Sequence, residues 1–233
     1  MTRHTTPILA VIALMLGAAS ASAATPQPTG FPNENWTLVF DEEFSGNALN
    51  TAQWDYHQGT ANNVTTSSKN VAVNGGNLVL TLASKTSGAE IESAAYNFAV
   101  GDYAEASVEF PGSGTTIYNW PAWWTSGQNW PTSGENDIAE GLGTLTVNYH
   151  SPLGGFSLGT IPGVWSNAFH IYGIYRGATA CDVFYDGNYV GEYPTSDNGQ
   201  AQRLFLTLGS GYGPTVTGAR SQVKVAYVRV WTP

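Results

Sequence analysis

The segment Gly134–Gly141, which reads GENDIAEG, places three carboxylates close together at Glu135, Asp137 and Glu140. Side chains on a β-strand alternate between its two faces, so Glu135 and Asp137 share a face, whereas strict alternation would put Glu140 on the other. A β-bulge at about Ile138–Ala139 restores the parity, because two residues of the bulged strand then oppose one on its neighbour. We therefore expect one bent strand with all three carboxylates on the same face.

This spacing suits the hydrolysis of a glycosidic bond by two carboxyl groups. With the bulge discounted, Glu135 and Glu140 are ~13 Å apart between Cα atoms, at ~3.3 Å per strand step. Side chains that lean toward each other can bring the carboxyls to ~5–5.5 Å, the separation at which one carboxylate attacks the sugar carbon directly and the configuration is retained. The competing interpretation is a solvated acidic edge, since charged residues are usually exposed. Against it, the segment lies between tryptophan-rich and glycine-rich stretches.

A tryptophan-rich stretch, residues 119–131, precedes the carboxylates and reads NWPAWWTSGQNWP. Aromatic side chains usually belong to the core, but indoles also stack on the flat C–H faces of sugar rings. Core and sugar platform are equally consistent with Trp123. The Gly-, Pro- and Asn-rich context favours a platform at Trp124 and Trp130.

The rest of the chain reads as short β-segments separated by turns rich in Gly, Asn and Pro. Asn74–Asn77 and Asp186–Asn188 contain the residues that hairpin turns with positive φ require. Helical periodicity is scarce, so we expect an all-β chain folded as a two-sheet β-sandwich. The expected strands are Trp36–Phe40, Asn77–Leu82, Tyr103–Phe110, Asn136–Glu140, Leu145–His150, Phe169–Tyr175, Asp182–Tyr185, Arg203–Leu208 and Gln222–Trp231.

Residues 1–23 have the order of a secretory signal peptide: a short basic start, an apolar run Ile8–Leu16, and small residues ending at Ala23. The apolar run is shorter than the ~20 residues that a membrane-spanning helix needs. We therefore expect cleavage after Ala23, secretion to the extracellular space and no membrane attachment afterwards. Residues 24–33 are expected to form a flexible leader, and residues 34–233 to form a single catalytic β-sandwich domain.

Charged residues are sparse and mostly acidic, with 8 Lys and Arg against 17 Asp and Glu and a formal net charge of −9. A nucleic-acid-binding protein needs a basic surface, and an acidic protein repels sulfated or uronic polyanions. We therefore expect no nucleic-acid partner and a neutral substrate. Cys181 is the sole cysteine, so no intrachain disulfide can form, and its strand-like context predicts a buried thiol.

Taken together, these motifs resemble glycoside hydrolase family 16 over nearly the whole chain after residue 23. GENDIAEG is similar to the family's E-x-D-x-x-E signature in the bulged form of the laminarinase-like, endo-β-1,3(4)-glucanase type. The ordered set of motifs is far more specific than that short signature alone. The other matching segments are, in the family's order, LVFDEEFSG, LNTAQWDY, GDYAEASVEFP, WPAWW, WP-x-x-GE, FHIYGI, FYDGNYVG and VAYVRVW.

The resemblance implies a curved antiparallel jelly roll, similar to legume lectins, with a cleft on its concave sheet. It implies Glu135 as the nucleophile, Glu140 as the general acid/base, and Asp137 as the residue that hydrogen-bonds the nucleophile. For His150 a purely structural role beside the carboxylates is the alternative to substrate binding. The substrate-binding residues that the resemblance implies are Tyr103, Glu105, Trp120, Trp124, Trp130 and His150.

Five positions depart from the family's pattern and bear on substrate and ions. Ser107 stands where many members carry an arginine that contacts sugar. Asn136 replaces the usual apolar residue, and Thr207 and Gly209 stand where lichenase-type members have asparagine and tryptophan. Ala226 replaces an aspartate that in several members binds a structural calcium opposite the cleft. We expect no required cofactor and no catalytic metal, and the structural calcium is left open.

The leading hypothesis is a secreted, endo-acting, retaining hydrolase of β-1,3- or mixed β-1,3-1,4-glucan that works by double displacement. A second hypothesis is hydrolysis or transglycosylation of another neutral β-glycan within the same family. The bulged motif favours hydrolysis, because the transglycosylase motif usually lacks the extra residue. A third is a carbohydrate-binding β-sandwich without catalysis, which the intact carboxylate trio disfavours. In each case the expected partner is a polysaccharide, and the protein is expected to be a monomer.

Overall fold

The computed structural model describes residues 1, 24–31, 35–95, 97–211 and 219–233. The regular secondary structure of this part of the chain consists of β-strands and one short 3₁₀ turn. The elements are β1 (Thr37–Glu42), β2 (Trp54–Tyr56), β3 (Thr60–Ala61), β4 (Val64–Thr66), η1 (Ser68–Asn70), β5 (Val71–Asn74), β6 (Asn77–Leu82), β7 (Ser87–Ser93), β8 (Tyr103–Glu109), β9 (Gly112–Ser113), β10 (Thr116–Ile117), β11 (Trp120–Ser126), β12 (Glu135–Gly141), β13 (Leu145–Ser151), β14 (Gly154–Thr160), β15 (His170–Arg176), β16 (Ala180–Tyr185), β17 (Asn188–Pro194), β18 (Arg203–Gly209) and β19 (Ser221–Thr232).

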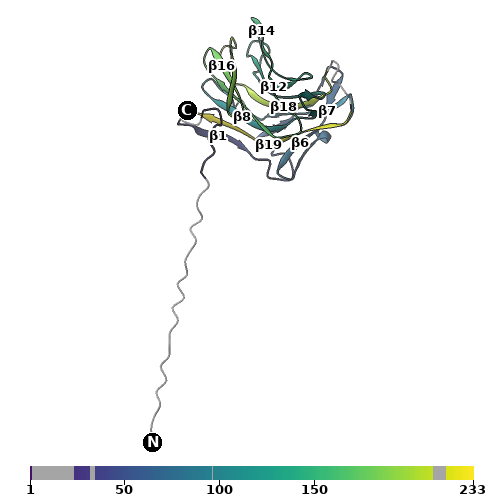
Figure 1. Cartoon of the computed structure of the whole chain (residues 1–233), viewed down its shortest axis with the longest axis vertical. Coiled ribbons are helices and arrows are strands. Elements are labelled where there is room, and N and C mark those ends of the chain that lie inside the picture. The colour runs from purple at the N-terminus through teal and green to yellow at the C-terminus, as the bar shows by residue number, and fades with distance from the viewer. Residues whose placement is uncertain (2–23, 32–34, 96, 212–218) are drawn as a thin grey trace.

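Two large sheets form a sandwich, which confirms the expected all-β architecture. The first, the β12 sheet, has the order β14-β13-β12-β11-β18-β7-β4-β3, with β2 also paired to β7. The second, the β8 sheet, has the order β17-β16-β15-β8-β19-β6-β5, with β1 also paired to β19. In Figure 1 the sandwich is curved, with β12, β18 and β7 on its hollow side and β1, β19 and β6 on the opposite side. The carboxylate strand therefore lies in the middle of the sheet on the hollow side.

The core forms where the inner faces of the two sheets meet, and strand alternation decides which residues enter it. On β6 the inward side chains of Leu78, Leu80 and Leu82 are fully buried, whereas those between them are partly exposed. Burying each such side chain contributes ~1.5–3 kcal/mol. The core also holds Trp123, whose Nε1 donates to the carbonyl of Tyr172 at 3.2 Å. Of the two interpretations of Trp123, the core one is thus correct.

The described part of the leader, residues 24–31, packs on the outer face of the β8 sheet, so the expectation of a flexible arm is wrong there. The backbone N and Oγ1 of Thr29 donate to Glu105 Oε2 at 3.0 and 2.7 Å. The physical reason is that this face carries aromatic side chains that require cover. The ring of Phe31 lies against those of Trp36, Tyr103, Tyr175 and Phe184.

The expected signal peptide falls on residues 2–23, which lie outside the described residues. Within the described ranges, the structure contains no helix with the length and apolar character needed to cross a bilayer.

Ala226 cannot supply the carboxylate that an aspartate at this position would offer to a structural calcium ion. Ala226 lies at a bulge of β19 and offers no side-chain oxygen, the donor that calcium requires. Further along β19, Arg229 Nε binds Asp41 at 3.2 Å and Glu43 at 2.9 Å. These two carboxylates therefore share the positive charge of one guanidinium group.

Candidate active site

Strand β12 has a β-bulge where the sequence predicts one. Against β13, the register shifts between Asp137 and Glu140, and a matching shift occurs against β11. The two residues between them, Ile138 and Ala139, are both fully buried in the core. The bulge therefore leaves Glu135, Asp137 and Glu140 together on the outward face of the β12 sheet.

A glycine stands at each end of this strand because the neighbouring residues leave no room for a side chain. Gly134 has a φ of +72°, and a Cβ there would lie 2.5 Å from the Cβ of Asp197. A Cβ on Gly141 would collide with Ile117 and Pro121. Positive φ and close approach are the two conditions that only glycine meets without strain. Both glycines of GENDIAEG thus fix where the carboxylate strand begins and ends.

Both oxygens of Glu140 are held by donors from the flanking strands. Trp120 Nε1 donates to Oε1 at 2.6 Å, and Asn148 Nδ2 donates to Oε2 at 2.6 Å. Thr146 Oγ1 accepts a second bond from Asn148 at 3.1 Å and donates to the backbone oxygen of Glu140 at 3.1 Å. Hydrogen bonds to a charged acceptor are short and strong, so this carboxylate has a well-defined position.

His150 contacts the other two carboxylates. It pairs with Glu135 across β12 and β13, and its Nε2 lies 3.4 Å from Asp137 Oδ2 and 3.8 Å from Glu135 Oε1. Its side chain is 45% exposed, whereas that of Asp137 is 8% exposed. The indole of Trp130 also hydrogen-bonds Glu135. The imidazole therefore bridges the two carboxylates and faces solvent.

Burial raises the pKa of all three carboxyl groups. At Glu135 the neighbouring charges of Asp137 and Glu140 add to burial and raise the pKa to about 7, although His150 opposes them. At Glu140 burial and the charge of Asp137 raise the pKa, while its two hydrogen-bond donors oppose them. The hydrogen bond to Asp137 raises the pKa of His150. Carboxyls this close titrate as a unit, so the raised pKa belongs to the trio and not to Glu135 alone.

The same residues offer a site for a metal ion. Among the described residues, Glu135, Asp137 and His150 form the one group of three or more potential ligands whose donor atoms all lie within 4.8 Å of one another. An ion there would occupy the carboxylate oxygens that the sugar chemistry requires.

Three of the four neighbouring tryptophans lie on the outward face of the β12 sheet. Trp120 and Trp124 are four residues apart on β11 and share that face, opposite to Trp123. The indole of Trp124 stacks on the ring of Phe205, with centroids 4.1 Å apart and planes at 20°. Trp130, in the loop before β12, is 61% exposed. The indole of Trp124 is therefore held rigidly by Phe205 behind it, whereas the indole of Trp130 is accessible to solvent.

A line of polar contacts continues from Trp124 across the sheet, and the sequence analysis missed it. Trp124 Nε1 donates to Thr207 Oγ1 at 2.8 Å, and that hydroxyl donates to Glu90 Oε2 at 3.0 Å. Glu90 in turn lies 3.5 Å from Nε2 of His57. Alternation within Ser87–Ser93 could have placed Glu90 on an outward face. Only the strand order, with β7 beside β18 and β18 beside β11, brings it to this face.

Tyr103 and Glu105 do not lie beside the carboxylates, so their expected place in the cleft is wrong. They belong to β8, which pairs with β15 and β19 in the opposite sheet. Ala104 and Ala106 face the core, and alternation therefore sends Tyr103 and Glu105 to the outer face of the sandwich. There Glu105 accepts hydrogen bonds from the leader and from Tyr227.

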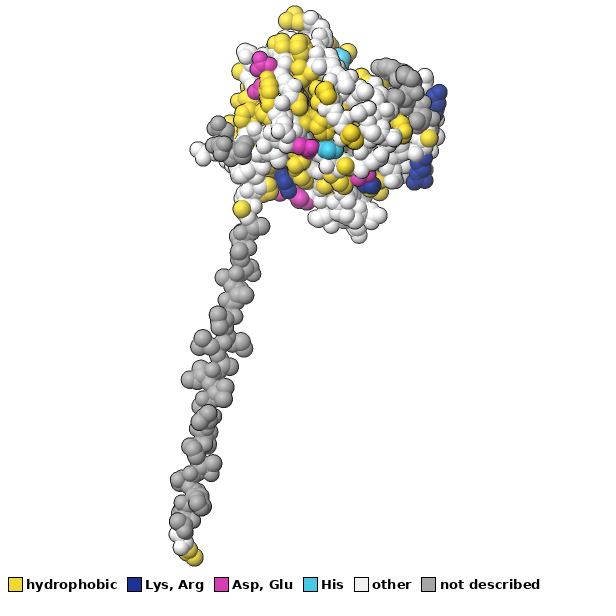
Figure 2. Space-filling model, viewed as in Figure 1, with side chains coloured by type: hydrophobic (Ala, Val, Ile, Leu, Met, Phe, Trp, Pro, Cys, Tyr) yellow, Lys and Arg dark blue, Asp and Glu magenta, His cyan; other side chains and the backbone are white. Residues whose placement is uncertain are grey.

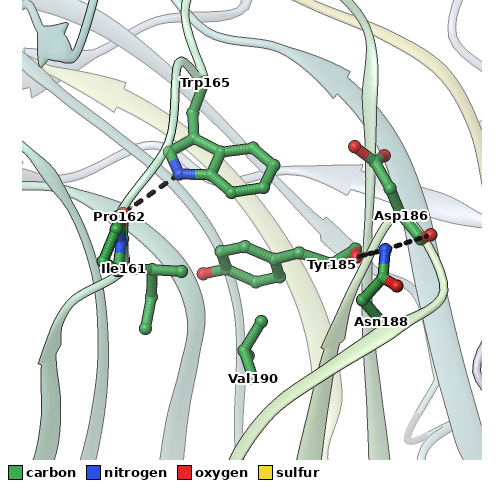
Figure 3. A pocket seen from close by; sticks show the side chains of 7 residues that line it. All are labelled: Ile161, Pro162, Trp165, Tyr185, Asp186, Asn188 and Val190. Carbon is green, nitrogen blue, oxygen red and sulfur yellow. Dashed lines mark hydrogen bonds between the residues drawn. The ribbon is translucent and has the colours of Figure 1, made fainter.

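A separate hollow of about 350 Å³ lies between β16, β17 and the segment after β14, and none of the three carboxylates lines it. Figure 3 shows the ring of Tyr185 lying between Trp165 and Val190. The hydroxyl of Tyr185 donates to the backbone oxygen of Ile138, in the bulge of β12, at 2.8 Å. The lining residues are Ile161, Pro162, Trp165, Tyr185, Asp186, Asn188 and Val190.

Residues 93–152 match the family model described as "XgeA-like, catalytic GH16 domain". This span, about a quarter of the chain, contains the whole of β12, its bulge and His150. The segment that carries the three carboxylates therefore matches the catalytic domain of glycoside hydrolase family 16. This match supports the family that the motifs resemble.

A short segment of the chain is similar to a probable endo-1,3(4)-β-glucanase of Aspergillus niger, with 49% identity over 35 residues. Those residues make up 15% of this chain and 5% of the relative's length. The fold is similar to the laminarinase catalytic domain from Thermotoga maritima, with a TM-score of 0.71 and 22% identity over 86% of this chain and 99% of that one. It is also similar to the endo-1,3-β-glucanase from Streptomyces sioyaensis, with a TM-score of 0.70 and 23% identity over 91% and 100%. At such identities the likeness shows the fold.

Proposed function

We propose that this protein is a secreted, endo-acting, retaining glycoside hydrolase of family 16 that cleaves β-1,3- or mixed β-1,3-1,4-glucan. The observation that supports the proposal most strongly is the bulge in β12, which puts Glu135, Asp137 and Glu140 on one face. A lectin-like sandwich gains nothing from three clustered acids, whereas double displacement needs two carboxyls and a way to keep one protonated.

In the first step the carboxylate of Glu135 forms a bond to the anomeric carbon as the glycosidic C–O bond breaks. A protonated Glu140 gives its proton to the departing oxygen, which leaves as a sugar hydroxyl. Burial and the charge of Asp137 raise the pKa of Glu140, which favours its protonated form. Bonding to sugar removes the charge of Glu135, so the pKa of Glu140 falls. Glu140 then accepts a proton from the attacking water, and the bond between the sugar and Glu135 breaks with the original configuration restored.

We propose a neutral substrate whose sugar rings stack on aromatic side chains. Figure 2 shows few charged side chains on the visible surface, in line with a charged content of 11%. Trp124 on Phe205 offers a flat, rigid surface next to β12. The relative from Aspergillus niger and the two similar structures carry glucanase or laminarinase names.

A second candidate substrate is another neutral β-glycan. The surroundings of Thr207 and Gly209 support this second candidate. The hydroxyl of Thr207 is already bonded to both Trp124 and Glu90, and Gly209 beside Trp120 adds no side chain. The sugar contacts that an asparagine and a tryptophan would make at these positions are therefore not available.

A glycan panel with product sizing tests both candidates. Laminarin, lichenan, xyloglucan, agarose and carrageenan are incubated with the wild type and with Glu135→Gln as the inactive control. We expect oligosaccharides of several lengths from laminarin or lichenan, and a β-anomer as the first product in proton NMR. Release of monosaccharide alone would contradict endo action, and a first α-anomer would contradict retention. Cleavage of xyloglucan alone would select the second candidate.

Secretion rests on the order of residues in the first 23 positions. Expression of the full chain in a secreting bacterial host should place the protein in the medium with Ala24 as its first residue. Amino-terminal sequencing and mass measurement check this. Recovery of the uncleaved chain from the membrane fraction would instead indicate an anchor.

A further inference from the structure

A buried polar cluster lies directly behind the carboxylates, and Asn136 is at its centre. Asn136 stands between Glu135 and Asp137, so alternation points its side chain away from them, into the core. It is fully buried. Most polar residues at such a depth cost stability unless every polar atom finds a partner.

Every hydrogen-bonding position of Asn136 is occupied. Its Nδ2 donates to Thr125 Oγ1 at 3.0 Å and to Gln202 Oε1 at 2.7 Å. Its Oδ1 accepts from the hydroxyl of Tyr193 at 2.8 Å and faces Sγ of Cys181 at 3.7 Å. An asparagine side chain has two N–H donors and an oxygen with two lone pairs, so nothing is left unpaired. The amide is therefore fixed in one orientation.

Gln202 connects this hydrogen-bond network to Ser133, which lies just before β12. Its Nε2 donates to the backbone oxygen of Ser133 at 2.8 Å and lies 3.5 Å from Asp197 Oδ2. Its Oε1 also accepts from Thr125 at 2.6 Å. Asp197 forms a buried ion pair with Arg176 at 2.9 Å, where both side chains are almost inaccessible. The start of β12 is thus tied to β11, β15 and the segments flanking β17 and β18.

A second contact holds the inner side of the bulge. The hydroxyl of Tyr185 on β16 donates to the backbone oxygen of Ile138 at 2.8 Å. A bulge disrupts the ladder locally, and this bond supplies a partner to one of its carbonyls. Asp137 therefore lies between two anchored residues, Asn136 and Ile138.

The buried groups around Asn136 stay protonated over the pH range in which the carboxyls on the outward face of β12 change charge. Burial raises the pKa of Cys181 to about 12, and it raises the pKa values of Tyr193 and Tyr185 well above their usual range. These groups stay neutral throughout the pH range in which the carboxylates change charge. The titratable groups that flank Asn136 are, on the outward side, Glu135, Asp137, Glu140 and His150, and, on the inner side, Cys181, Tyr185, Tyr193, Arg176 and Asp197.

We propose that Asn136 is a positioning residue, whose four-way hydrogen bonding sets the rotation of β12 and hence the placement of Glu135 and Asp137 relative to Glu140. An apolar residue at this position would fill the same space but would hold the strand by packing alone, without direction. Side chains on the two faces of a strand rotate together. A small turn of the amide therefore swings the carboxylates on the other face, and a misplacement of ~1 Å can cost ~100-fold in rate.

Asn136→Leu tests the proposal because it keeps the size of the side chain and removes all four bonds. With the glucan that the wild type cleaves, we expect KM within about two-fold and kcat lower by ~10- to 100-fold, together with a displaced pH profile of kcat. Tyr193→Phe removes a single hydroxyl and keeps the ring. It should lower kcat by a smaller factor and shift the profile in the same direction.

Val223→Ala is the matched control, since Val223 is a fully buried core residue on β19, outside the cluster. It should lower the melting temperature while leaving kcat and the pH profile below that temperature unchanged. If Asn136→Leu behaves like Val223→Ala, with lower stability but an unchanged kcat and pH profile, the positioning role is refuted. Should Asn136→Leu not fold, Tyr193→Phe decides in the same way.

The inference rests on the proposed function only where kcat is the readout. Titration of 13C-carboxyl-labelled glutamate, assigned with Glu135→Gln and Glu140→Gln, follows the carboxyls without any substrate. Asn136→Leu or Tyr193→Phe should shift the titration of Glu135, whereas Val223→Ala should not. A shifted titration in a protein that cleaves no glucan would support the positioning role and reject the proposed substrate. An unshifted titration in both cluster variants would overturn the positioning role.

Discussion

Trp120 Nε1 lies 2.6 Å from Glu140 Oε1, across the pair of strands β11 and β12. Asn148 holds the other oxygen of the same carboxylate from β13. Donors that bond a carboxylate favour its ionised form, so they hold the pKa of Glu140 below the value that burial and Asp137 would give it. This arrangement suits the second half of double displacement, in which Glu140 must be ionised to act as a base.

Trp120→Phe should therefore change the pH profile in a defined direction. Loss of the donor raises the pKa of Glu140, so the alkaline limb of kcat/KM, which reports the protonated acid, should move to higher pH. A hydrogen bond to a charged group is worth ~1.5–3 kcal/mol, and at ~1.36 kcal/mol per pKa unit this limb should move by roughly one to two pH units. Trp165→Phe is the control, because that indole donates to the backbone oxygen of Ile161 instead. An alkaline limb that stays in place in Trp120→Phe would separate Trp120 from the acid/base.

Replacement of His150 should move the acidic limb. The imidazole lowers the pKa of Glu135 and of Asp137, since a nearby positive charge favours ionised carboxyls. The pKa of His150 is itself raised, so this charge is present on the acidic side of neutrality. In His150→Gln the carboxyls should hold their protons to higher pH, and the acidic limb of kcat/KM should shift upward. A limb that moves downward, or not at all, would contradict the electrostatic role of His150.

Trp124→Ala should weaken the binding of long glucans and leave the fold intact. Stacking contributes ~0.5–1.5 kcal/mol beyond area, which corresponds to roughly a two- to twelve-fold rise in KM. Phe205→Ala should have a similar effect through Trp124, because it removes the ring that backs the indole. Trp123→Ala is the contrasting variant: it empties a core position and should cost ~3–5 kcal/mol of stability. Unchanged kcat/KM for Trp124→Ala on every accepted polymer would remove it from the site.

Glu105→Ala should affect stability and not catalysis, because Glu105 holds the leader on the outer face. It accepts bonds from Thr29 and Tyr227, and loss of such buried partners costs ~1–3 kcal/mol. Thermal unfolding should shift to lower temperature, with kcat and KM within two-fold of the wild type by the usual scatter of distant substitutions. A large rise in KM at full folding would return Glu105 to the substrate site.

The sequence predicts local features of the site well and non-local ones poorly. The bulge at Ile138–Ala139 follows from the spacing of three acids, because alternation within one strand is a short-range rule. The error at Tyr103 arises because a strand motif does not reveal to which sheet the strand belongs. Glu90 was missed for the same reason, since only the order β11-β18-β7 brings it near Trp124.

The packing of the leader was missed for a different physical reason. Residues rich in Pro, Thr and Gly carry little apolar surface of their own, and such composition favours a loose segment. What holds them is the exposed aromatic face of the β8 sheet, together with Glu105, and both come from distant parts of the chain. The composition of a segment does not reveal whether another part of the protein offers a surface on which it can pack.

The two glutamates should differ in how external anions rescue them, and this separates nucleophile from acid/base. Glu135→Ala removes the attacking carboxylate, so hydrolysis should be lost, and azide entering the vacated space should attack a substrate with a good leaving group once, giving an α-glycosyl azide. Glu140→Ala keeps the nucleophile, so an activated substrate should still form the glycosyl-enzyme. Azide should then intercept that intermediate in a second inversion and give a β-glycosyl azide of retained configuration. Proton NMR of the isolated azides distinguishes the two anomers.

The same pair of variants also reports on proton transfer. Glu140→Ala should lose activity most on natural glucans, whose poor leaving group requires protonation, and least on activated aryl glycosides, since a positioned acid contributes ~100- to 10,000-fold. Glu135→Ala should lose activity on both kinds of substrate alike, because no leaving group replaces a missing nucleophile. An α-azide from Glu140→Ala, or a β-azide from Glu135→Ala, would reverse the two roles while leaving the site itself in place.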